Sequence, residues 1–442
     1  STNNSNPLSK INDTYPRTDV KERAYLVGAE LKQGRPLLSV HDSLDELARL
    51  ADTAGLDIIG RTHQRLDRPN LSTFIGQGKV EEVKESIEEL EIDVVLFDDE
   101  LSPRHQRELE KAFGLETKVL DRTALILDIF AQHASTREGK LQVELAQLEY
   151  RIPRLTRMWT HLARQAGTGG AGGSVGLRGP GEKQIEMDRR MISQRLAVLK
   201  RDLDDVMAHR QRHRAKRQQT ELQTVAIVGY TNAGKSTLIN RLAGANVLSA
   251  DMLFATLDPT TRRVDLPGGR EVLFTDTVGF IQKLPTNIVA AFRATLEEIA
   301  EADVILHVAD ATHPNVAAQI EAVEDTLAEL EVDKLPTVLA FNKMDARTDE
   351  SVTLPDMNGM PTVEISGMTG IGIRELLMAI EAATEHYMDS ATVFLPYKRG
   401  DLVSLFHERG QVEREEHTGE GVRIFGRLPT RILVYFKPYM ES

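Results

Sequence analysis

The chain has no cysteine among its 442 residues, which excludes disulfide bonds and thiolate zinc sites. It also lacks an apolar run near the roughly 18 residues that a membrane-spanning helix needs. The twelve histidines are scattered, without the spacing of a metal-ligand pair. The first residues are polar and lack the apolar core of a signal peptide, so we expect a disordered tail over residues 1–22. These absences favour a cytoplasmic protein with no membrane span, and we expect a monomer.

Acidic residues outnumber basic ones, and the net charge of −13 by itself opposes binding to nucleic acid. The charges are segregated, however. Carboxylates crowd residues 81–100, whereas Lys and Arg crowd residues 189–217. An acidic protein can still present one basic arm, so composition does not exclude an RNA partner.

Residues 225–237 carry the strongest motif in the chain. A strand-length apolar stretch ends in Gly229, and Gly-Lys-Ser follows at 234–236 before a helix-like stretch. Strand, G-x-x-x-x-G-K-S and helix form a P-loop in its required context, although an ordinary glycine-containing turn is the alternative. Such a loop wraps a phosphate chain at the positive end of a helix. We expect Lys235 beside the β- and γ-phosphates and the Ser236 hydroxyl on Mg²⁺.

Two later segments indicate the metal and the base. Residues 272–276 read as a buried strand that ends in Asp276, where a carboxylate holds Mg²⁺, and Gly279 can bring its N–H to the γ-phosphate. Residues 338–345 read as a strand that ends in Asn-Lys-Met-Asp. Asp345 can accept from N1–H and N2–H₂ of guanine, and adenine lacks both donors. The sequence therefore predicts a site for GTP and GDP.

The predicted nucleotide contacts come from the P-loop, the loop before the metal strand, the D-x-x-G segment, the N-K-x-D segment and a base-side loop after strand 363–366. They are Gly229, Tyr230, Thr231, Asn232, Ala233, Gly234, Lys235, Ser236, Thr237, Phe254, Ala255, Thr256, Leu257, Asp258, Asp276, Thr277, Val278, Gly279, Asn342, Lys343, Met344, Asp345, Ser366, Gly367 and Met368.

The region from Ala24 to Asp121 alternates between strand-like and helix-like runs, which is typical of a small α/β domain with a largely parallel sheet. We expect strands at 24–30, 56–61, 94–97 and 117–120, and helices at 43–54, 79–90 and 103–113. Ser43 is expected to cap the first helix. Residues 76–79, Gly-Gln-Gly-Lys, are either a phosphate-binding turn or, as we favour, a structural one. Asp98, Asp99 and Glu100 are either metal ligands or, as we favour, a solvated helix cap.

Two heptad-patterned helices follow. The first, Lys140 to Gln165, contains Pro153, which should kink or break it. The second repeats the apolar rhythm from Ile192 to Val206. Between them, the glycine-rich residues 167–181 cannot be helical, so we expect an antiparallel hairpin with a flexible tip.

The tip is either a mere linker or a contact surface for RNA. It has no acidic residue before Glu182, and arginine and lysine lie within it and beside it. The second helix continues into a run rich in cations, which favours phosphate contact over a solvated helix face. The candidate RNA contacts are Arg164, Arg178, Lys183, Arg210, Arg212, Arg214, Lys216 and Arg217.

After Asp389 the chain reads as a small α/β domain with short strands, among them residues 392–396, 421–428 and 432–436, and one helix at 400–408. The sequence does not indicate what this domain does. We expect five segments: a tail (1–22), an N-terminal α/β domain (23–135), a helical hairpin (136–220), a P-loop GTPase domain (221–388) and a C-terminal α/β domain (389–442).

The nucleotide motifs resemble the guanine-binding GTPases related to translation factors, and the whole chain beyond residue 22 resembles the HflX family of ribosome-associated GTPases. The resemblance rests on Gly229-Tyr-Thr-Asn-Ala-Gly-Lys-Ser236, Phe254-Ala-Thr-Leu-Asp-Pro259, Asp276-Thr-Val-Gly-Phe280, Ile126-Leu-Asp-Ile-Phe130, Lys140-Leu-Gln-Val-Glu-Leu-Ala-Gln147 and Gly176-Leu-Arg-Gly-Pro-Gly-Glu182.

The resemblance implies binding to the large (50S) ribosomal subunit and splitting of stalled or stressed 70S ribosomes. It also implies that the N-terminal domain and the hairpin bind ribosomal RNA. Thr256 is by likeness the threonine that closes on Mg²⁺, although spacing alone leaves Thr260 and Thr261 open. One departure is Ser366-Gly-Met, where many GTPases carry Ser-Ala-Lys, and we expect weaker affinity for the base.

Phe280 stands where many GTPases place a water-orienting glutamine, so we expect slow intrinsic hydrolysis that the ribosome stimulates. The expected catalytic residues are Lys235, Thr256 and Asn232, and by analogy Asn232 recruits K⁺ beside the phosphates. Two rival functions stay open. One is a GTP-dependent binding switch without remodelling activity, and the other is an RNA-remodelling NTPase with a second nucleotide at residues 76–79.

Overall fold

The computed structural model describes residues 21–32, 37–114, 116–165, 190–206, 222–244, 254, 260–283, 299–347, 354–357, 359–386 and 388–440. The expected tail and the glycine-rich tip at 167–181 lie outside these ranges. The chain divides into two compact units, residues 1–33 with 42–122 and residues 34–41 with 123–442. We describe each unit by itself.

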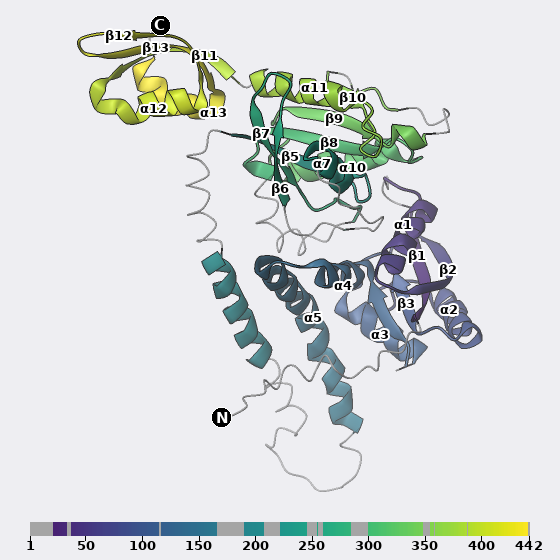
Figure 1. The fold of residues 1–442 in the computed structure, drawn as a ribbon. Helices are drawn as coiled ribbons and strands as arrows, with labels where there is room; N and C mark the ends of the chain where they lie inside the picture. The colour runs from purple at the N-terminus through teal and green to yellow at the C-terminus, as the bar shows by residue number, and fades with distance from the viewer. Residues whose placement is uncertain are drawn as a thin grey trace, which may run out of the picture. The chain divides into compact units, whose positions relative to one another are not determined.

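The first unit is a four-stranded sheet, with all neighbouring strands parallel, in the order β2-β1-β3-β4 (Figure 1). Its elements are β1 (Arg23–Leu31), α1 (Val40–Thr53), β2 (Asp57–Leu66), α2 (Gln77–Leu90), β3 (Val94–Phe97), α3 (Pro103–Phe113) and β4 (Lys118–Asp121). Alternate residues of β1 and β3, Val27 and Val95 among them, pack with α2 and α3 in one core. α1 buries Leu44, Leu47 and Leu50 along one stripe, as expected for a helix covering a sheet.

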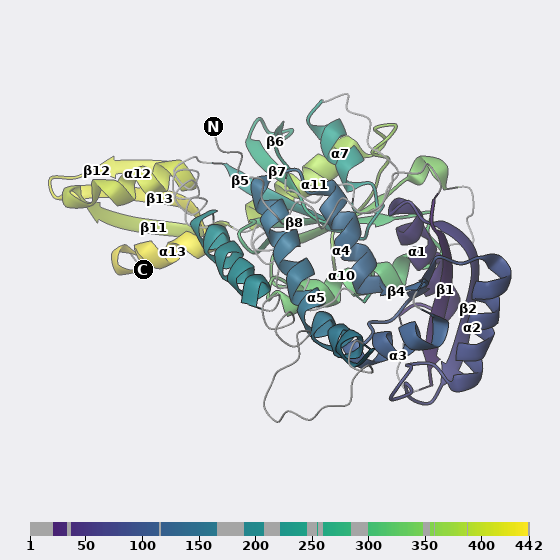
Figure 2. The same cartoon turned by 90° about the horizontal axis from the view of Figure 1, so that it is seen from below.

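The second unit begins with helices. α4 (Arg122–His133) starts where the first unit ends. α5 (Arg137–Gln165) contains Pro153 and is not broken there. Figures 1 and 2 show α5 and the helix at 190–206 side by side and running in opposite directions. Ion pairs join Arg195 to Glu144 at 2.7 Å and Lys200 to Glu149 at 3.0 Å. The predicted antiparallel hairpin is confirmed.

A six-stranded sheet forms the next part, in the order β10-β9-β8-β5-β7-β6. Only β6 runs antiparallel to its neighbour. The elements are β5 (Gln223–Gly229), α7 (Lys235–Leu242), β6 (Thr260–Asp265), β7 (Glu271–Asp276), β8 (Val304–Asp310), α10 (Val316–Glu329), β9 (Thr337–Asn342), η2 (Met344–Ala346), β10 (Thr362–Glu364) and α11 (Ile373–His386).

Helices cover both faces of this sheet. Leu306 and Val308 of β8 share a core with α7 and α11, whereas Ala309 shares another core with α10. Alternate residues of a strand point to opposite faces, so α10 lies across the sheet from α7 and α11. Because helices cover both faces of the sheet, both faces of its inner strands are buried. This explains why every residue of β8 is buried.

The chain ends in a three-stranded antiparallel sheet, in the order β11-β13-β12. Its elements are β11 (Met388–Pro396), η3 (Tyr397–Arg399), α12 (Gly400–Arg409), β12 (Gln411–His417), β13 (Gly421–Pro429), α13 (Thr430–Phe436) and η4 (Lys437–Tyr439). The prediction of a strand at 432–436 is wrong. These residues belong to α13, because Phe436 is buried edge-on against Phe406 at 5.6 Å between ring centroids.

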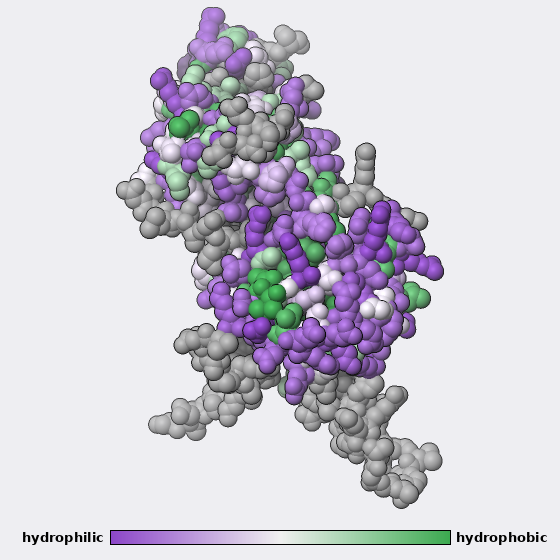
Figure 3. All heavy atoms as spheres, turned by 90° about the vertical axis from the view of Figure 1, so that its right-hand side faces the viewer, coloured by the Kyte–Doolittle hydropathy of each residue, from purple (hydrophilic) through white to green (hydrophobic). Residues whose placement is uncertain are grey.

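The predicted multidomain α/β fold class is confirmed. Within the described residues, no helix is long and apolar enough to cross a membrane. The face drawn in Figure 3 is mostly hydrophilic, with hydrophobic residues in small groups. Single exposed apolar side chains such as Leu71, at 82%, are ordinary on such surfaces.

Candidate nucleotide-binding site

The predicted nucleotide contacts that the structure describes come mainly from one edge of the six-stranded sheet. Parallel strands end at a common edge, and β5, β7, β8 and β9 end there in Gly229, Asp276, Asp310 and Asn342. In open α/β sheets, ligands bind beyond the carboxyl ends of the strands.

The loop from Gly229 to Gly234 has the backbone geometry of a phosphate cradle. Gly234 has φ of 88°, and a Cβ there would lie 2.4 Å from Asn342 Nδ2. Asn232 adopts φ of 62°, a left-handed conformation that Asn tolerates better than most residues. α7 begins at Lys235, so its N-terminal N–H groups face the loop.

Lys235 is buried, with 6% of its surface exposed, and its Nζ donates to the carbonyl oxygens of Gly229 at 3.0 Å and Tyr230 at 2.9 Å. Burial lowers the pKa of Lys235 to about 8, although the charge of Asp276 opposes the shift. The side chain is thus a cation held at the phosphate cradle.

Ser236 and Asp276 lie together, and the Ser236 hydroxyl donates to Asp276 Oδ2 at 2.9 Å. A hydroxyl beside a buried carboxylate suits a small hard cation such as Mg²⁺, which prefers oxygen ligands. A Cβ on Gly279 would lie 2.9 Å from Thr231 Cγ2 and 3.0 Å from Lys235 Nζ. A side chain at position 279 would therefore press on Thr231 and Lys235.

One buried amide joins the phosphate side to the base side. Asn342 donates from Nδ2 to the Ala233 carbonyl at 2.8 Å, and its Oδ1 accepts from the Gly367 backbone N–H at 2.8 Å. The two loops are thus linked by the Asn of the N-K-x-D segment.

The base side is fixed by two further contacts. Ser366 Oγ donates to Asp345 Oδ1 at 2.5 Å, and Lys343 Nζ lies 2.8 Å from Asp310 Oδ2. Burial alone would raise the pKa of Asp310, but hydrogen bonds from Lys343 and Thr312 hold that pKa below its ordinary value. The Asp345 side chain lies at an exposed position beside these anchored groups.

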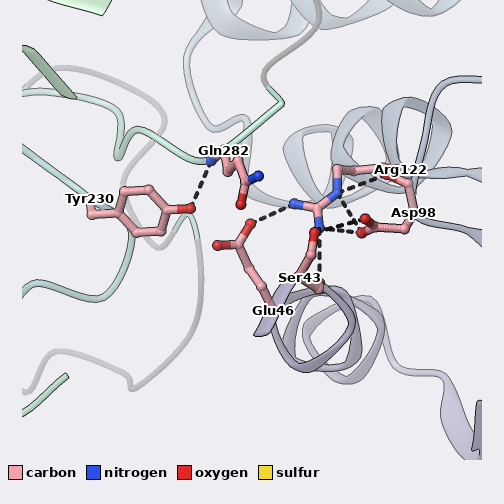
Figure 4. A network of polar contacts seen from close by, with 6 residues as sticks. All are labelled: Ser43, Glu46, Asp98, Arg122, Tyr230 and Gln282. Atoms are coloured by element: carbon pink, nitrogen blue, oxygen red, sulfur yellow. Dashed lines mark hydrogen bonds and ion pairs between the residues drawn. The ribbon is translucent and has the colours of Figure 1, made fainter. Parts of the chain in front are cut away.

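The segment after Asp276 is bonded to the P-loop through the backbone. Phe280 N donates to Gly229 O at 3.0 Å, and Thr231 N donates to Phe280 O at 2.7 Å. The Tyr230 hydroxyl accepts from the Gln282 N–H at 2.8 Å (Figure 4). Phe280 itself is 3% exposed.

The other predicted nucleotide contacts are distributed as follows. Thr277 donates to the Ile227 carbonyl at 2.7 Å, and Val278 is buried. Thr237 lies in α7, Met344 in η2, and Met368 is 71% exposed. Ala255, Thr256, Leu257 and Asp258 lie outside the described residues.

The region before β6 is described only in part. Phe254 is buried with φ of 56°, and its ring packs edge-on against Phe130 of α4 at 4.7 Å between centroids. Thr260 and Thr261 belong to β6, where Thr261 Oγ1 lies 3.2 Å from Thr275 Oγ1. Both threonines pair with residues of β7, Thr260 with Asp276 and Thr261 with Thr275.

None of the predicted RNA contacts has a described side chain. Arg164 lies within α5, and its side chain is outside the description. Arg178, Lys183, Arg210, Arg212, Arg214, Lys216 and Arg217 lie outside the described residues altogether.

Residues 76–79 form the start of α2, with Gly76 as its N-cap and Gln77 as its first helical residue. Lys79 Nζ contacts Glu82 Oε2 at 2.6 Å and Thr62 Oγ1 at 3.1 Å, so an acidic side chain already pairs with this lysine. The Gly76 N–H donates to Gln64 Oε1 at 2.8 Å. These contacts weaken the case for a second nucleotide here.

The expected solvated cap at Asp98 is wrong, and so is the expected capping role of Ser43. Ser102 caps α3 by accepting from His105 N at 3.2 Å. Asp98 is 1% exposed, and Ser43 lies inside α1 and donates to Asp98 Oδ2 at 2.7 Å. Across the described residues, no group of three or more histidine, aspartate or glutamate side chains could hold a metal ion.

Both residues belong to a buried network around Arg122 (Figure 4). The guanidinium pairs with Asp98 and, at 2.5 Å, with Glu46 Oε1, and it donates to the Ser43 carbonyl at 3.0 Å. Burial by itself lowers the pKa of Arg122. The charges of Asp98 and Glu46 raise it by more than burial lowers it, so the pKa lies above its ordinary value. Sequence reasoning missed Arg122 because no local pattern marks a buried guanidinium.

Two residues near the site were also missed. Arg241 of α7 donates from Nε to the Gly367 carbonyl at 3.2 Å and also contacts the Met368 carbonyl, so it braces the base-side loop. Its position five residues after Ser236 on the P-loop helix was the available signal. His307 of β8 is 1% exposed, and burial lowers its pKa to about 3, with a further contribution from Lys235, so it is neutral.

Comparison with known proteins agrees with this geometry. Three protein-family profiles match, described as "GTP-binding GTPase N-terminal" (residues 41–131), "GTP-binding GTPase Middle Region" (133–217) and "50S ribosome-binding GTPase" (224–343). The chain is 44% identical to GTPase HflX of Lacrimispora saccharolytica over 414 residues, which cover 94% of this chain and 95% of that protein. It is 41% identical to GTPase HflX of Escherichia coli over 418 residues, with 94% and 95% covered.

Among solved structures, a GTP-binding protein from Sulfolobus solfataricus in complex with GDP aligns with a TM-score of 0.41 and 22% identity. The alignment covers 83% of this chain and 99% of that chain.

A P-loop and an N-K-x-D segment at one edge of a parallel sheet define a P-loop GTPase domain. With more than 40% identity over nearly its whole length, the chain belongs to the HflX family of GTPases. The resemblance seen in the sequence is confirmed.

Proposed function

We propose that this protein binds and hydrolyses GTP, binds the large (50S) ribosomal subunit, and splits or recycles stalled or stressed 70S ribosomes. The observation that carries the nucleotide part is the Asn342 amide, which ties the phosphate loop to the base loop at 2.8 Å on each side. Family membership and the match to a ribosome-binding GTPase profile support the ribosomal part.

The residues around the phosphates divide into three roles. Lys235 places its ammonium beside the β- and γ-phosphates, where it exchanges two carbonyl acceptors for phosphate oxygens. Ser236 and Asp276, with Thr256, would hold Mg²⁺, which would supply charge neutralisation at the β- and γ-oxygens. Asn232 would bind K⁺ beside the β- and γ-phosphates.

Guanine is chosen by Asp345. Its carboxylate is positioned by Ser366 and accepts from two base donors that adenine lacks. Gly367, anchored by Asn342 and Arg241, presents the base-side backbone although the usual Lys is replaced by Met368.

Hydrolysis is slow in the isolated protein because Phe280 offers the attacking water no hydrogen-bonding group. Its backbone is also engaged by the P-loop. The large subunit therefore raises turnover severalfold or more, and equal turnover with saturating subunits would contradict this. Turnover that is faster in KCl than in NaCl, with the difference lost in Asn232→Ala, would support the potassium site.

The RNA contacts remain predictions from sequence. Arg164, Arg178, Lys183 and the cations between Arg210 and Arg217 would meet ribosomal phosphates, with the glycine-rich tip entering a narrow cleft.

The deciding experiment is light scattering of 70S ribosomes mixed with the protein. Scattering should fall with GTP or a non-hydrolysable analogue and not with GDP. Asp345→Asn supplies a matched control, because it should act with xanthosine triphosphate rather than GTP. GTP-dependent cosedimentation without any fall in scattering would instead identify a binding switch without remodelling activity.

A further inference from the structure

The C-terminal domain has two different sheet faces. α12 and α13 lie on the same side of β11, β12 and β13 in both views (Figures 1 and 2). On that side Val393, Ile424 and Phe406 form a core. Alternation along each strand puts the intervening residues on the opposite face, where none of this domain's described helices lies.

Strand pairing arranges nine side chains of this opposite face in three rows. Each row takes one residue from β11, one from the central strand β13 and one from β12. The rows are Ser390–Arg427–Gln411, Thr392–Phe425–Arg414 and Phe394–Arg423–Glu416.

Two phenylalanines of this face lie outside the hydrophobic core of the domain. Phe394 and Phe425 are partly exposed and do not belong to the apolar cluster under the helices. They stand diagonally on adjacent strands, with Phe425 opposite Thr392 and Phe394 opposite Arg423. Such rings are available to stack on a ligand.

Arginines accompany both rings. The Arg414 guanidinium lies 5.5 Å from the Phe425 centroid, and that of Arg423 lies 5.9 Å from the Phe394 centroid. Arg427 is exposed in the neighbouring row. Glu416 is the single acid in the nine, and it lies within 4 Å of both Arg414 and Arg423. The face is cationic in a chain whose net charge is −13.

We propose that this face, made by β11, β13 and β12, binds unpaired RNA nucleotides. Bases stack on aromatic side chains and arginine planes, and arginines also meet the phosphates. The order β-α-β-β-α, with aromatic residues on the central strand and its neighbour, is the arrangement through which RNA-recognition-motif sheets stack bases.

Charge and strand pairing favour RNA over other occupants. A double helix hides the faces of its bases, so it would leave both rings unused. An added peptide strand would pair with an edge of the sheet and would leave the rings and arginines of this face uncovered.

The test uses the full chain and a fluorescent oligouridylate of roughly 12 nucleotides, within the range that such sheets and grooves bind. Fluorescence anisotropy gives its affinity for the wild type and for the double variant Phe394→Ala/Phe425→Ala. We expect binding to weaken about tenfold or more, because each stacked base contributes substantially. Phe425→Tyr should bind as the wild type does.

Tyr435→Ala is the matched control, because Tyr435 is an aromatic residue of α13 that is 62% exposed on the helical side. It should leave affinity unchanged. Thermal unfolding of every variant checks that the domain is folded. Crosslinking of 4-thiouridine RNA should label peptides from β11 or β13.

Unchanged affinity in the double variant, or crosslinks confined to other segments, would overturn the proposal. Equal competition by double-stranded RNA would do the same. A change of oligomeric state in the double variant, with unchanged RNA binding, would assign the face to a second copy of the chain instead.

Discussion

The pKa of Lys235 makes nucleotide binding depend on pH. Burial lowers this pKa to about 8, and the Nζ donates to two backbone carbonyls. A triphosphate brings negative oxygens to the same nitrogen and favours its charged form. Binding must therefore be accompanied by proton uptake wherever the free site is partly neutral.

The magnitude follows from the lowered pKa. At pH 8 about half of the free sites are neutral, so binding should take up about 0.5 proton. The fraction of charged sites falls about fourfold between about pH 6.5 and 8.5, and the apparent affinity should fall by the same factor. The folded pKa is depressed, so the unfolded chain holds the proton longer, and the nucleotide-free fold should gain stability as pH rises from about 8 towards 10.5.

The assay is isothermal titration calorimetry with a non-hydrolysable GTP analogue, repeated at pH 8 in two buffers with different enthalpies of ionisation. The difference between the two heats gives the number of protons taken up. Lys235→Arg is the control, because its guanidinium stays charged throughout and its residual binding should show no uptake. Uptake below about 0.1 proton in the wild type, with affinity flat across the pH range, would refute the reasoning.

Three further outcomes are expected. Asp345→Asn should weaken GTP binding about 100-fold, because it removes a charge-assisted pair of hydrogen bonds, and should create measurable affinity for xanthosine triphosphate in the same titration. Gly279→Ala should lower the rate of GTP hydrolysis and leave GDP affinity nearly unchanged, because the new Cβ would meet Thr231 at 2.9 Å on the γ-phosphate side; equal losses in both measurements would contradict this. Arg122→Ala should lower the free energy of unfolding by about 3–5 kcal/mol in urea, because two carboxylates stay buried without their partner, whereas Arg61→Ala, from a half-exposed pair, should lower it by about 1 kcal/mol or less.

Features that depend on residues adjacent in the chain could be predicted from the sequence. A four-residue apolar run between polar neighbours marks β3 at 94–97, and the P-loop chemistry of Lys235 and Ser236 depends on residues adjacent in the chain. Element ends are less certain, since β2 extends to Leu66, five residues beyond the expected Arg61. The extension comes from pairing with β1, which lies elsewhere in the chain.

Long-range contacts explain the failures. The sequence around Asp98 predicts a solvated helix cap. In the structure, Asp98 instead pairs with Arg122, which lies 24 residues further along the chain. Residues 432–436 are mostly β-branched or aromatic and resemble a strand, yet they form part of α13, which packs Phe436 on Phe406. The joining of Ala233 to Asn342 across 109 residues was equally invisible, although each motif was recognised by itself.

The same contacts indicate which part of the site responds to the nucleotide. Asn342 joins the phosphate loop to the base loop, so we expect GDP and GTP to meet the same surfaces there. We propose that the difference between the two nucleotides is felt beside Gly279, where the γ-phosphate is expected. Phe280 is held to the P-loop by two backbone hydrogen bonds, one of them to the same Gly229 carbonyl that accepts from Lys235. A γ-phosphate that draws Lys235 away changes the partners of that carbonyl, and so couples phosphate binding directly to the segment that carries Phe280.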